Sequence, residues 1–219
     1  MIEVCPGNFE AHTLTDPCIA PTDITPGTII FGGYDTTKYS GDLVPFQLID
    51  YDPYNGYSLD IAAPAMDFVH DGKNYTVPSS SVYHTITLDP GTAISLIPAD
   101  QFTAINDVLA LTESTTEPFY TVPCDVATWS GSFDFTISGS QGQMTLQVPW
   151  AELVLSLDDG TCAFGLAPQR TTVLVTVLGE TVLGETILRS AYLLYNYDNG
   201  TVSIAQVKYD QSDGHIISL

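Results

Sequence analysis

The chain has 219 residues, with 26 acidic and only 5 basic side chains, so its formal net charge is −21. Hydrophobic residues make up 44% of the chain, a content that excludes a disordered protein. The shortage of basic residues excludes nucleic acids and anionic membranes as partners, because both are bound through basic patches. The charge is typical of a protein that works in acid, and equally of a secreted protein kept soluble by its charge.

Strand patterns bounded by Gly, Pro, Asn or Asp dominate the first half of the chain. In the last-but-one of these runs, alternation places Ile86 and Leu88 on one face of a strand. Asp89 comes next, so we expect its carboxylate to point away from that apolar face. The runs are residues 27–33, 41–49, 57–69, 74–78, 82–88 and 92–98.

One helix is predicted directly after these strands. Phe102, Ile105 and Leu109 recur at the i, i+3, i+7 spacing of one helical face. Pro98 and Asp100 lie near its start, where proline and acidic residues are favoured.

The second half returns to strands and ends in a hairpin. A short turn or helix is expected at residues 186–189, followed by a hairpin with Asn199 and Gly200 at its tip, because Asn-Gly is a strong hairpin signal. The sequence "TVLGE" occurs at 176–180 and again at 181–185, which indicates a local duplication rather than a solenoid. The expected strands are 119–123, 133–138, 144–149, 152–157, 162–167 and 171–179.

No linker or change of composition divides the chain, so we expect one all-β domain over residues 1–219. Within it, residues 1–24 form an atypical segment that contains two cysteines, and residues 210–219 form a tail.

Four cysteines are present, and their spacing does not indicate a metal. None belongs to a Cys-x-x-Cys pair and no histidine stands at ligand spacing, so neither a metal site nor a cofactor is expected. Two disulfides are the default if the chain is secreted. The triplets that begin at Asn74 and Asn199 are candidate glycosylation sites and agree with secretion.

The ends of the chain contain no recognisable targeting segment. The start "MIEVCPGNFEAHTL" has no apolar core, so it is not a signal peptide, and the tail "DGHIISL" is too short to specify a lipid anchor. No stretch is long enough to span a membrane. For a secreted protein, we therefore expect either an export signal upstream of this chain or a truncated start.

Five segments of the chain, taken in order, carry a resemblance to a known family. They are "GTIIFGGYDTTKYSGDLVPFQLI" (27–49), "TLDPGTAISLIPADQFTAIN" (87–106), "YTVPCD" (120–125), "CAFGLAP" (162–168) and "VLGETILRSAYLLYNYDNGTVSIAQ" (182–206). Together they resemble the C-terminal half of pepsin-like aspartic peptidases (peptidase family A1), especially the secreted fungal members. The second segment is similar to the active-site loop that usually reads Asp-Ser-Gly-Thr or Asp-Thr-Gly-Thr, with the helix that follows it.

The resemblance implies the fold of a single lobe of the bilobal acid protease, all-β with one or two short helices. It implies that Asp89 is the catalytic acid, that Gly91 offers its N–H to the carboxylate, and that Thr92 hydrogen-bonds a carboxylate oxygen. The alternatives are an ordinary Asp-Pro-Gly turn followed by a strand threonine. Gly184 matches the glycine that packs under the loop, although the copy of this element at 177–179 leaves the register ambiguous.

Pro90 departs from the family pattern, in which a Thr or Ser hydroxyl at this position crosses to the opposite loop and locks the two loops together. Proline has neither a hydroxyl nor an N–H, so that lock cannot form. The resemblance also implies a Cys124–Cys162 disulfide, which leaves Cys5–Cys18 as the second pair.

The chain contains no Asp-Thr-Gly or Asp-Ser-Gly sequence, so a second catalytic Asp has to come from a complementary N-terminal lobe or a second copy. The first hypothesis is therefore an aspartic endopeptidase homologue that acts on peptide or protein substrates and is inactive alone. The second is a non-catalytic peptide-binding or decoy module, which Pro90 favours. The third is a structural remnant without activity.

Overall fold

The computed structural model describes residues 2–4, 28–52, 56–59, 64–78, 86–115, 119–169, 181–209 and 214–218. Within these ranges strands dominate, with two short α-helices, which confirms the predicted all-β class. None of the helices described is both long and apolar enough to cross a membrane. The predicted Cys5–Cys18 disulfide, the strand at 171–179 and the start of the run 82–88 lie outside the described residues.

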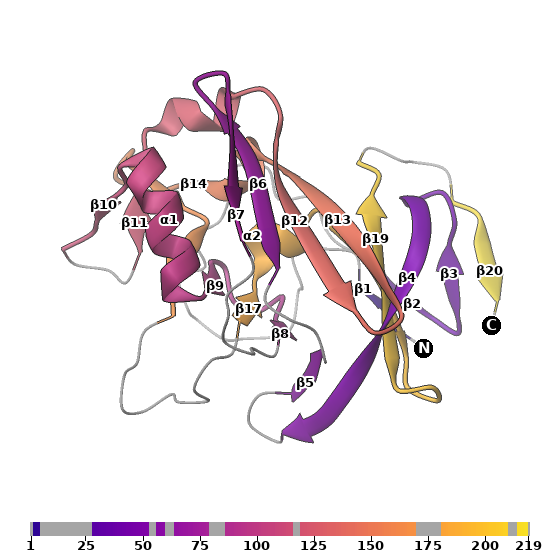
Figure 1. The fold of residues 1–219 in the computed structure, drawn as a ribbon. Helices are drawn as coiled ribbons and strands as arrows, with labels where there is room; N and C mark the ends of the chain where they lie inside the picture. The colour runs from indigo at the N-terminus through magenta and orange to yellow at the C-terminus, as the bar shows by residue number, and fades with distance from the viewer. Residues whose placement is uncertain are drawn as a thin grey trace.

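The largest sheet that the structure describes has ten strands and curves through the whole molecule (Figure 1). Antiparallel pairs make up most of it, but β8 with β17 and β9 with β16 are parallel. In spatial order the strands are β16 (Leu166–Pro168), β9 (Ser95–Ile97), β17 (Thr181–Leu183), β8 (Ile86–Leu88), β5 (Gly56–Leu59), β4 (Tyr39–Asp52), β19 (Thr201–Val207), β18 (Ala191–Asn196), β1 (Ile2–Val4) and β2 (Ile29–Phe31).

Three smaller sheets complete the described architecture. The first contains β13 (Gly142–Pro149), β12 (Ser132–Gly139), β6 (Ala65–His70) and β7 (Lys73–Val77), in that order. The second contains β10 (Thr112–Glu113), β11 (Tyr120–Thr121), β15 (Cys162–Phe164) and β14 (Val154–Ser156). The third pairs β20 (Ile216–Ser218) with β3 (Gly33–Asp35). The helices are α1 (Ala99–Leu109), α2 (Glu185–Leu188) and the 3-10 helices η1 (Cys124–Thr128) and η2 (Trp150–Leu153).

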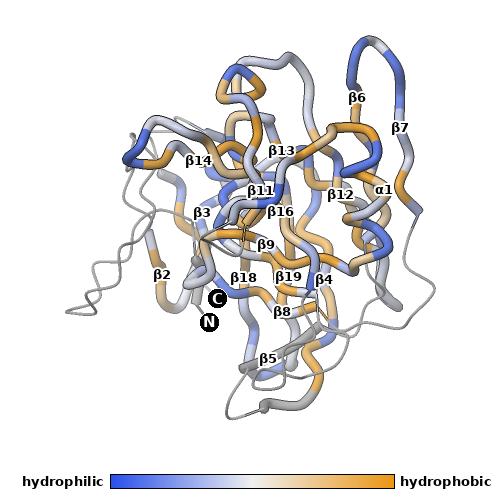
Figure 2. The backbone as a smooth tube through the Cα atoms, turned by 90° about the vertical axis from the view of Figure 1, so that its left-hand side faces the viewer, coloured by the Kyte–Doolittle hydropathy of each residue, from blue (hydrophilic) through white to orange (hydrophobic). Residues whose placement is uncertain are grey.

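The hydrophobic core is centred on a group of aromatic side chains between these sheets. Phe68 on β6 stacks on Phe133 of β12, with ring centroids 4.7 Å apart, and the edge of Trp150 meets Phe133 at 5.6 Å. Burial of a side chain of this size contributes about 1.5–3 kcal/mol. Orange, hydrophobic segments run through β8 and β9 in the middle of the molecule, whereas the turn between β6 and β7 is blue (Figure 2).

Helix α1 confirms the predicted helix and packs its apolar face inward. Phe102 and Ile105 are buried, and the helix ends where Ala110 adopts a left-handed conformation and donates its N–H to Asn106 O at 2.8 Å. Buried Gln101 fixes the helix against the chain, because its Nε2 donates to the carbonyls of Pro64 and Pro78 at 2.8 Å each.

Several predicted strands differ in their limits, and three of them are divided or begin differently for local reasons. The run 27–33 breaks at Gly32, whose φ of +75° is a conformation that favours glycine, so β2 and β3 are separate strands. The run 162–167 is divided by Gly165 into β15 and β16, and the run 152–157 begins as η2.

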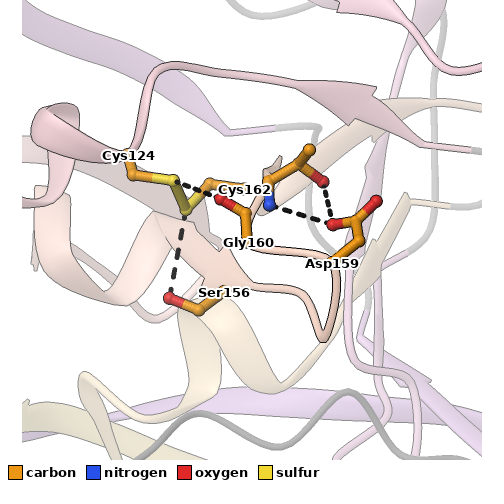
Figure 3. Close-up of a disulfide and its surroundings, with 6 residues drawn as sticks. Cys124, Ser156, Asp159, Gly160 and Cys162 are labelled. Carbon is orange, nitrogen blue, oxygen red and sulfur yellow. Dashed lines mark hydrogen bonds between the residues drawn. A yellow bond between two sulfur atoms is a disulfide. The ribbon is translucent and has the colours of Figure 1, made fainter.

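The Cys124–Cys162 disulfide joins the start of η1 to β15, as the family resemblance implies (Figure 3). The cross-link spans 38 residues of sequence and is accompanied by a hydrogen bond from Val122 N to Cys162 O at 3.0 Å. Nearby, Asp159 closes the turn before β15 by accepting hydrogen bonds from the N–H and hydroxyl of Thr161. The disulfide therefore ties the sheet that contains β14 and β15 to the helix η1.

Removal of this cross-link is expected to destabilise the folded chain. The double variant Cys124→Ala/Cys162→Ala should lose about 2–4 kcal/mol in the free energy of unfolding, measured by urea titration, because the unfolded chain regains the freedom of the closed loop. Ser156→Ala is the control: its hydroxyl lies 3.9 Å from Cys162 Sγ, and its removal leaves the cross-link intact. Equal stability of the double variant and the wild type would contradict the prediction.

The tail contains a strand that sequence reasoning did not identify. β20 pairs with β3, and Asp35 at the end of β3 is buried beside it. Asp35 Oδ1 accepts hydrogen bonds from His215 N at 2.9 Å and from the N–H and hydroxyl of Thr37 at 2.9 and 2.7 Å. Burial by itself raises the pKa of Asp35, but these hydrogen bonds from His215 and Thr37 outweigh it and hold the pKa below its usual value. The ionised carboxylate therefore anchors the tail.

Asp35→Asn should make stability less sensitive to acid. Because the pKa of Asp35 is lowered in the folded chain, its contribution is complete above the unfolded value of about 3.9 and is lost as pH falls through the folded value. We expect the melting temperature of the variant to lie roughly 3–6 °C below that of the wild type at pH 6, and the gap to narrow below pH 4. Asp42→Asn is the control, because it removes the same charge without removing these hydrogen bonds. A difference in melting temperature between the wild type and Asp35→Asn that stays constant from pH 6 to pH 2 would refute the anchoring role of Asp35.

Candidate active site

Asp89 lies directly after β8, where the strand runs parallel to β17. Leu88 stands opposite Leu183 in this pairing, and the N–H of Asp89 continues it by donating to Leu183 O at 3.0 Å. The strand pair therefore fixes the backbone of Asp89 before the chain turns away. Its side chain is half-buried.

A tight turn holds both oxygens of the Asp89 carboxylate. Thr92 N–H donates to Asp89 O at 3.2 Å, which places Pro90 at the second position of the turn, where proline is favoured. Oδ1 accepts the N–H of Gly91 at 2.9 Å, and Oδ2 accepts the hydroxyl of Thr92 at 2.6 Å. Two donors thus orient one acid, while Pro90 is exposed and supplies no hydroxyl.

The chain after β17 passes directly beneath this turn. Glu185 N–H donates to Thr92 O at 2.8 Å, immediately beyond Gly184. A Cβ atom on Gly184 would overlap the carbonyl oxygen of Thr92, so the close approach requires glycine. Gly184 is thus the described copy of the "VLG" element that meets the loop, whereas the copy at 177–179 lies outside the described residues.

Two buried hydroxyls support the crossing, by which we mean the passage of Gly184 beneath the Asp89 turn. Neither hydroxyl was predicted from the sequence. Ser95 Oγ accepts the N–H of Gly184 at 2.9 Å and lies 3.1 Å from Thr186 Oγ1. Thr186 in turn donates to Gly165 O at 2.8 Å. The only signal was Ser95, a hydroxyl residue within the apolar run at residues 93–98, since buried polar groups almost always find partners. Thr186 lies between Glu185 and Ile187, in a mixed segment that gives no such signal.

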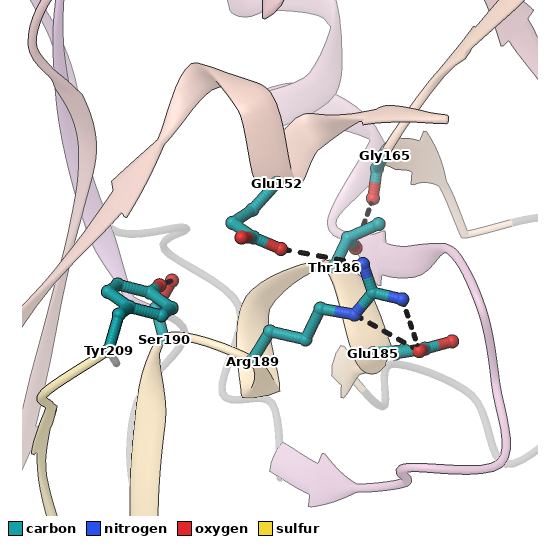
Figure 4. A network of polar contacts seen from close by, with 7 residues as sticks. All are labelled: Glu152, Gly165, Glu185, Thr186, Arg189, Ser190 and Tyr209. Atoms are coloured by element: carbon teal, nitrogen blue, oxygen red, sulfur yellow. Dashed lines mark hydrogen bonds and ion pairs between the residues drawn. The ribbon is translucent and has the colours of Figure 1, made fainter. Parts of the chain in front are cut away.

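Arg189 connects α2 to η2 through ion pairs with one glutamate on each helix (Figure 4). Its Nη2 lies 2.5 Å from Glu185 Oε1, and its Nη1 lies 3.5 Å from Glu152 Oε2 on η2. Next to it, Ser190 and Tyr209 share a hydrogen bond of 2.9 Å. These contacts fix the helix that follows Gly184.

The predicted site residues therefore divide into one group and several outlying positions. Asp89, Pro90, Gly91, Thr92 and Gly184 come together at a single turn. The candidate glycosylation sites lie elsewhere, Asn74 on β7 and Asn199 between β18 and β19, and the disulfide lies in the sheet of β14 and β15.

Chemically, the turn presents one oriented carboxylate that can exchange a proton with a bound water. No group of three or more His, Cys, Asp or Glu residues in the described ranges is arranged to hold a metal ion. Hydrolysis of a peptide bond by carboxyl groups, with no other catalytic group, requires a second carboxylate on the other side of that water.

Substitution of Gly184 should test the crossing beneath the turn. Gly184→Ala is expected to lower the free energy of unfolding by about 1–3 kcal/mol, because the added methyl group forces the two backbones apart. Gly91→Ala is the matched control, since its Cβ would lie 3.2 Å from the movable Oδ1 of Asp89 rather than against backbone. Urea unfolding that ranks Gly91→Ala as the more damaging change would contradict this arrangement.

Comparisons with known proteins identify a family that matches most of the chain. The family described as "Eukaryotic aspartyl protease" matches residues 19–207. "Secreted aspartic protease 9" of Candida albicans is 30% identical over 204 residues, which cover 93% of this chain and 36% of that protein. "Acid protease" of Saccharomycopsis fibuligera is 32% identical over 192 residues, which cover 85% of this chain and 45% of that protein. The chain thus spans less than half the length of these relatives.

The crystal structure of an aspartic proteinase from Irpex lacteus has the same fold, with a TM-score of 0.65 at 16% sequence identity. The superposition covers 96% of this chain but 57% of the solved one, as expected for one lobe of a two-lobed fold. The matched family extends across most of the sequence, including the Asp89 turn and the crossing at Gly184. The chain belongs to the eukaryotic aspartyl protease family.

Proposed function

We propose that this chain supplies one half of an aspartic endopeptidase site and that Asp89 is its catalytic carboxylate. The observation that carries the proposal is the turn itself, in which Gly91 N–H and Thr92 Oγ1 hold the two oxygens of one acid. A turn that needed only to reverse the chain would not require both oxygens to be oriented.

In the proposed reaction, two carboxylates flank one water. One accepts the water's proton as the water attacks the carbonyl carbon of the peptide bond, while the other donates a proton to the carbonyl oxygen. Because two like charges held close together cannot both be ionised, the pair shares a proton and titrates as a unit. Gly91 and Thr92 keep Asp89 aimed at the water, so little reorganisation is needed during the reaction.

The second carboxylate has to come from outside the residues of this chain. The matched relatives are more than twice as long as the aligned part, and the sequence contains a single Asp-Pro-Gly-Thr turn of this type. We infer that a complementary lobe, or a second copy of the chain, provides the opposing Asp, and that the chain alone does not hydrolyse peptides. A lobe pair related by a two-fold axis would present two such turns to one water.

Pro90 favours a second function, that of a non-catalytic module that binds or sequesters peptides. At this position the hydroxyl that would lock two opposing loops is missing, and the proline ring is exposed. The family resemblance supports ancestry more strongly than present activity, because function resides in the site and not in the fold.

An extracellular, acidic environment fits both functions. Names of the relatives include "Secreted aspartic protease 9" and "Acid protease". A net charge of −21 produces self-repulsion at neutral pH, which protonation of carboxylates relieves in acid.

A chimera separates the two functions. The chain is fused behind the N-terminal lobe of a fungal relative, in place of that relative's own C-terminal lobe, and assayed on denatured protein at acid pH with and without a pepstatin-type inhibitor. We expect inhibitor-sensitive cleavage that falls by about 10²–10⁴-fold in Asp89→Ala. Pro90→Thr should raise the rate by about 2- to 10-fold, the value of one restored hydrogen bond.

Asp107→Asn, an exposed acid on α1, controls for the loss of a charge. Cleavage that survives Asp89→Ala would contradict the catalytic role of Asp89. A folded chimera that remains inactive even with Pro90→Thr, but still binds the inhibitor, would establish the binding module instead. The unfused chain is expected to show no inhibitor-sensitive cleavage, and activity that rises with the square of its concentration would reveal a catalytic dimer.

A further inference from the structure

The hairpin between β18 and β19 ends in a firmly held turn. Gly200 N–H donates to Tyr197 O at 3.3 Å, and Gly200 has a φ of +61°, a conformation that favours glycine. The carbonyl of Gly200 accepts two further hydrogen bonds from β4, from Gln47 Nε2 at 2.7 Å and from Leu48 N at 2.8 Å. The turn therefore keeps one shape, with Tyr197 as its first residue and Asn199 as its third.

This turn exposes an aromatic side chain and an amide together. Tyr197 is 48% exposed, one of the large hydrophobic side chains that the described structure leaves at the surface. Its ring stacks beside that of Tyr195, with the centroids 6.1 Å apart and the planes inclined at 18°. Asn199 is also exposed, two residues further along the same turn.

We propose that Asn199 is N-glycosylated and that Tyr197 is the platform on which its first sugar packs. Asn199, Gly200 and Thr201 form the Asn-x-Thr acceptor triplet, which begins at an exposed position of the turn between β18 and β19. The proposal concerns a modification site that is separate from the Asp89 turn and does not depend on the proposed function.

The modification is a group transfer from a lipid-diphosphate-linked oligosaccharide in the secretory pathway. Nδ2 of Asn199 forms a bond to the anomeric carbon of the first N-acetylglucosamine, and the bond from that carbon to the diphosphate oxygen breaks. The lipid diphosphate leaves with the bonding electrons, and the amide nitrogen loses one proton to the transferase. No oxidation or reduction takes place.

The ring of Tyr197 has a physical reason to contact that sugar. One face of N-acetylglucosamine carries only C–H bonds, and an aromatic ring with a polar tip offers such a face apolar area without burying a polar group. Because both residues belong to one four-residue turn, the sugar is tethered close to the ring and pays little entropy to reach it. The sugar would cover part of the apolar surface that Tyr197 now exposes.

The triplet at Asn74 provides an internal contrast. It lies in β7 rather than in a turn, and the residue two positions before it is Gly72, so no aromatic ring occupies the corresponding place. The residue opposite Asn74 across the hairpin is Val69, and the Thr76 hydroxyl donates to Asp67 Oδ1 at 2.5 Å. A sugar on Asn74 therefore lacks the partner that we assign to the sugar on Asn199.

The test uses the full chain expressed behind a secretion signal in a eukaryotic host. Mass spectrometry before and after treatment with a peptide N-glycosidase should show a glycan on Asn199, which is absent in Asn199→Gln and in Thr201→Ala. Samples come from both the secreted and the cell-retained fractions, so poor secretion leaves the measurement intact. A chain whose Asn199 is unmodified in both fractions would overturn the proposal.

The role of Tyr197 is tested by trimming the glycan to one N-acetylglucosamine and comparing melting temperatures. The trimmed wild type should melt about 2 °C above Asn199→Gln. When both proteins also carry Tyr197→Thr, the trimmed glycosylated chain and Asn199→Gln should have the same melting temperature. When both also carry Asn74→Gln, the difference in melting temperature should persist. A difference that survives Tyr197→Thr would show that the sugar does not pack on the ring. If Tyr197→Thr does not fold, Tyr197→Phe replaces it and should preserve the difference in melting temperature, because it keeps the ring. Loss of the difference in Tyr197→Phe would contradict the packing of the sugar on the ring.

Discussion

The contact between Gly184 and the turn that contains Asp89 is the constraint on which the rest of the site depends. Two backbone segments approach so closely there that no side chain fits between them, and the hydrogen bond from Glu185 N to Thr92 O spans the contact. Ser95 and Thr186 hold this crossing from below with buried hydroxyls. The orientation of the Asp89 carboxylate therefore follows from the packing of the whole lobe and not from the turn alone.

This dependence explains how the turn keeps its geometry with a proline at residue 90. The turn requires a backbone conformation, an N–H from Gly91 and a hydroxyl from Thr92, and none of these comes from residue 90. Proline fits the second position of the turn without strain. The turn therefore keeps its own geometry, although the exposed proline offers no hydroxyl to a neighbouring loop.

Much of the fold was predictable from local patterns, and the remainder required contacts between distant residues. Helix α1 followed from the spacing of Phe102 and Ile105, and the last hairpin from Asn199 and Gly200, because these signals are contained within a few residues. The short strand β20 was missed since its anchor, Asp35, lies 180 residues before His215. The ion pair of Arg189 with Glu152 was missed for the same reason, as each residue alone resembles a surface charge.

The site itself shows the same division. The position of the Asp89 loop could be inferred from its resemblance to a known family. Gly184 could be inferred from the residues that follow it in the sequence, which resemble the same family. The pair Ser95 and Thr186 could not be inferred, because a hydroxyl in an apolar run, such as Ser95, reveals that a partner exists without revealing which one.

The parallel pairing of β8 with β17 has a consequence for the order in which the chain folds. Ser95 and Gly184, which meet beneath the turn, are 89 residues apart in sequence, so the crossing closes a long loop. Such contacts carry an entropic cost that local hairpins such as β12–β13 do not, and they tend to form late. During synthesis, the acid is made long before the glycine that holds it in place. The Asp89 turn is therefore expected to reach its final geometry only when most of the lobe has already folded.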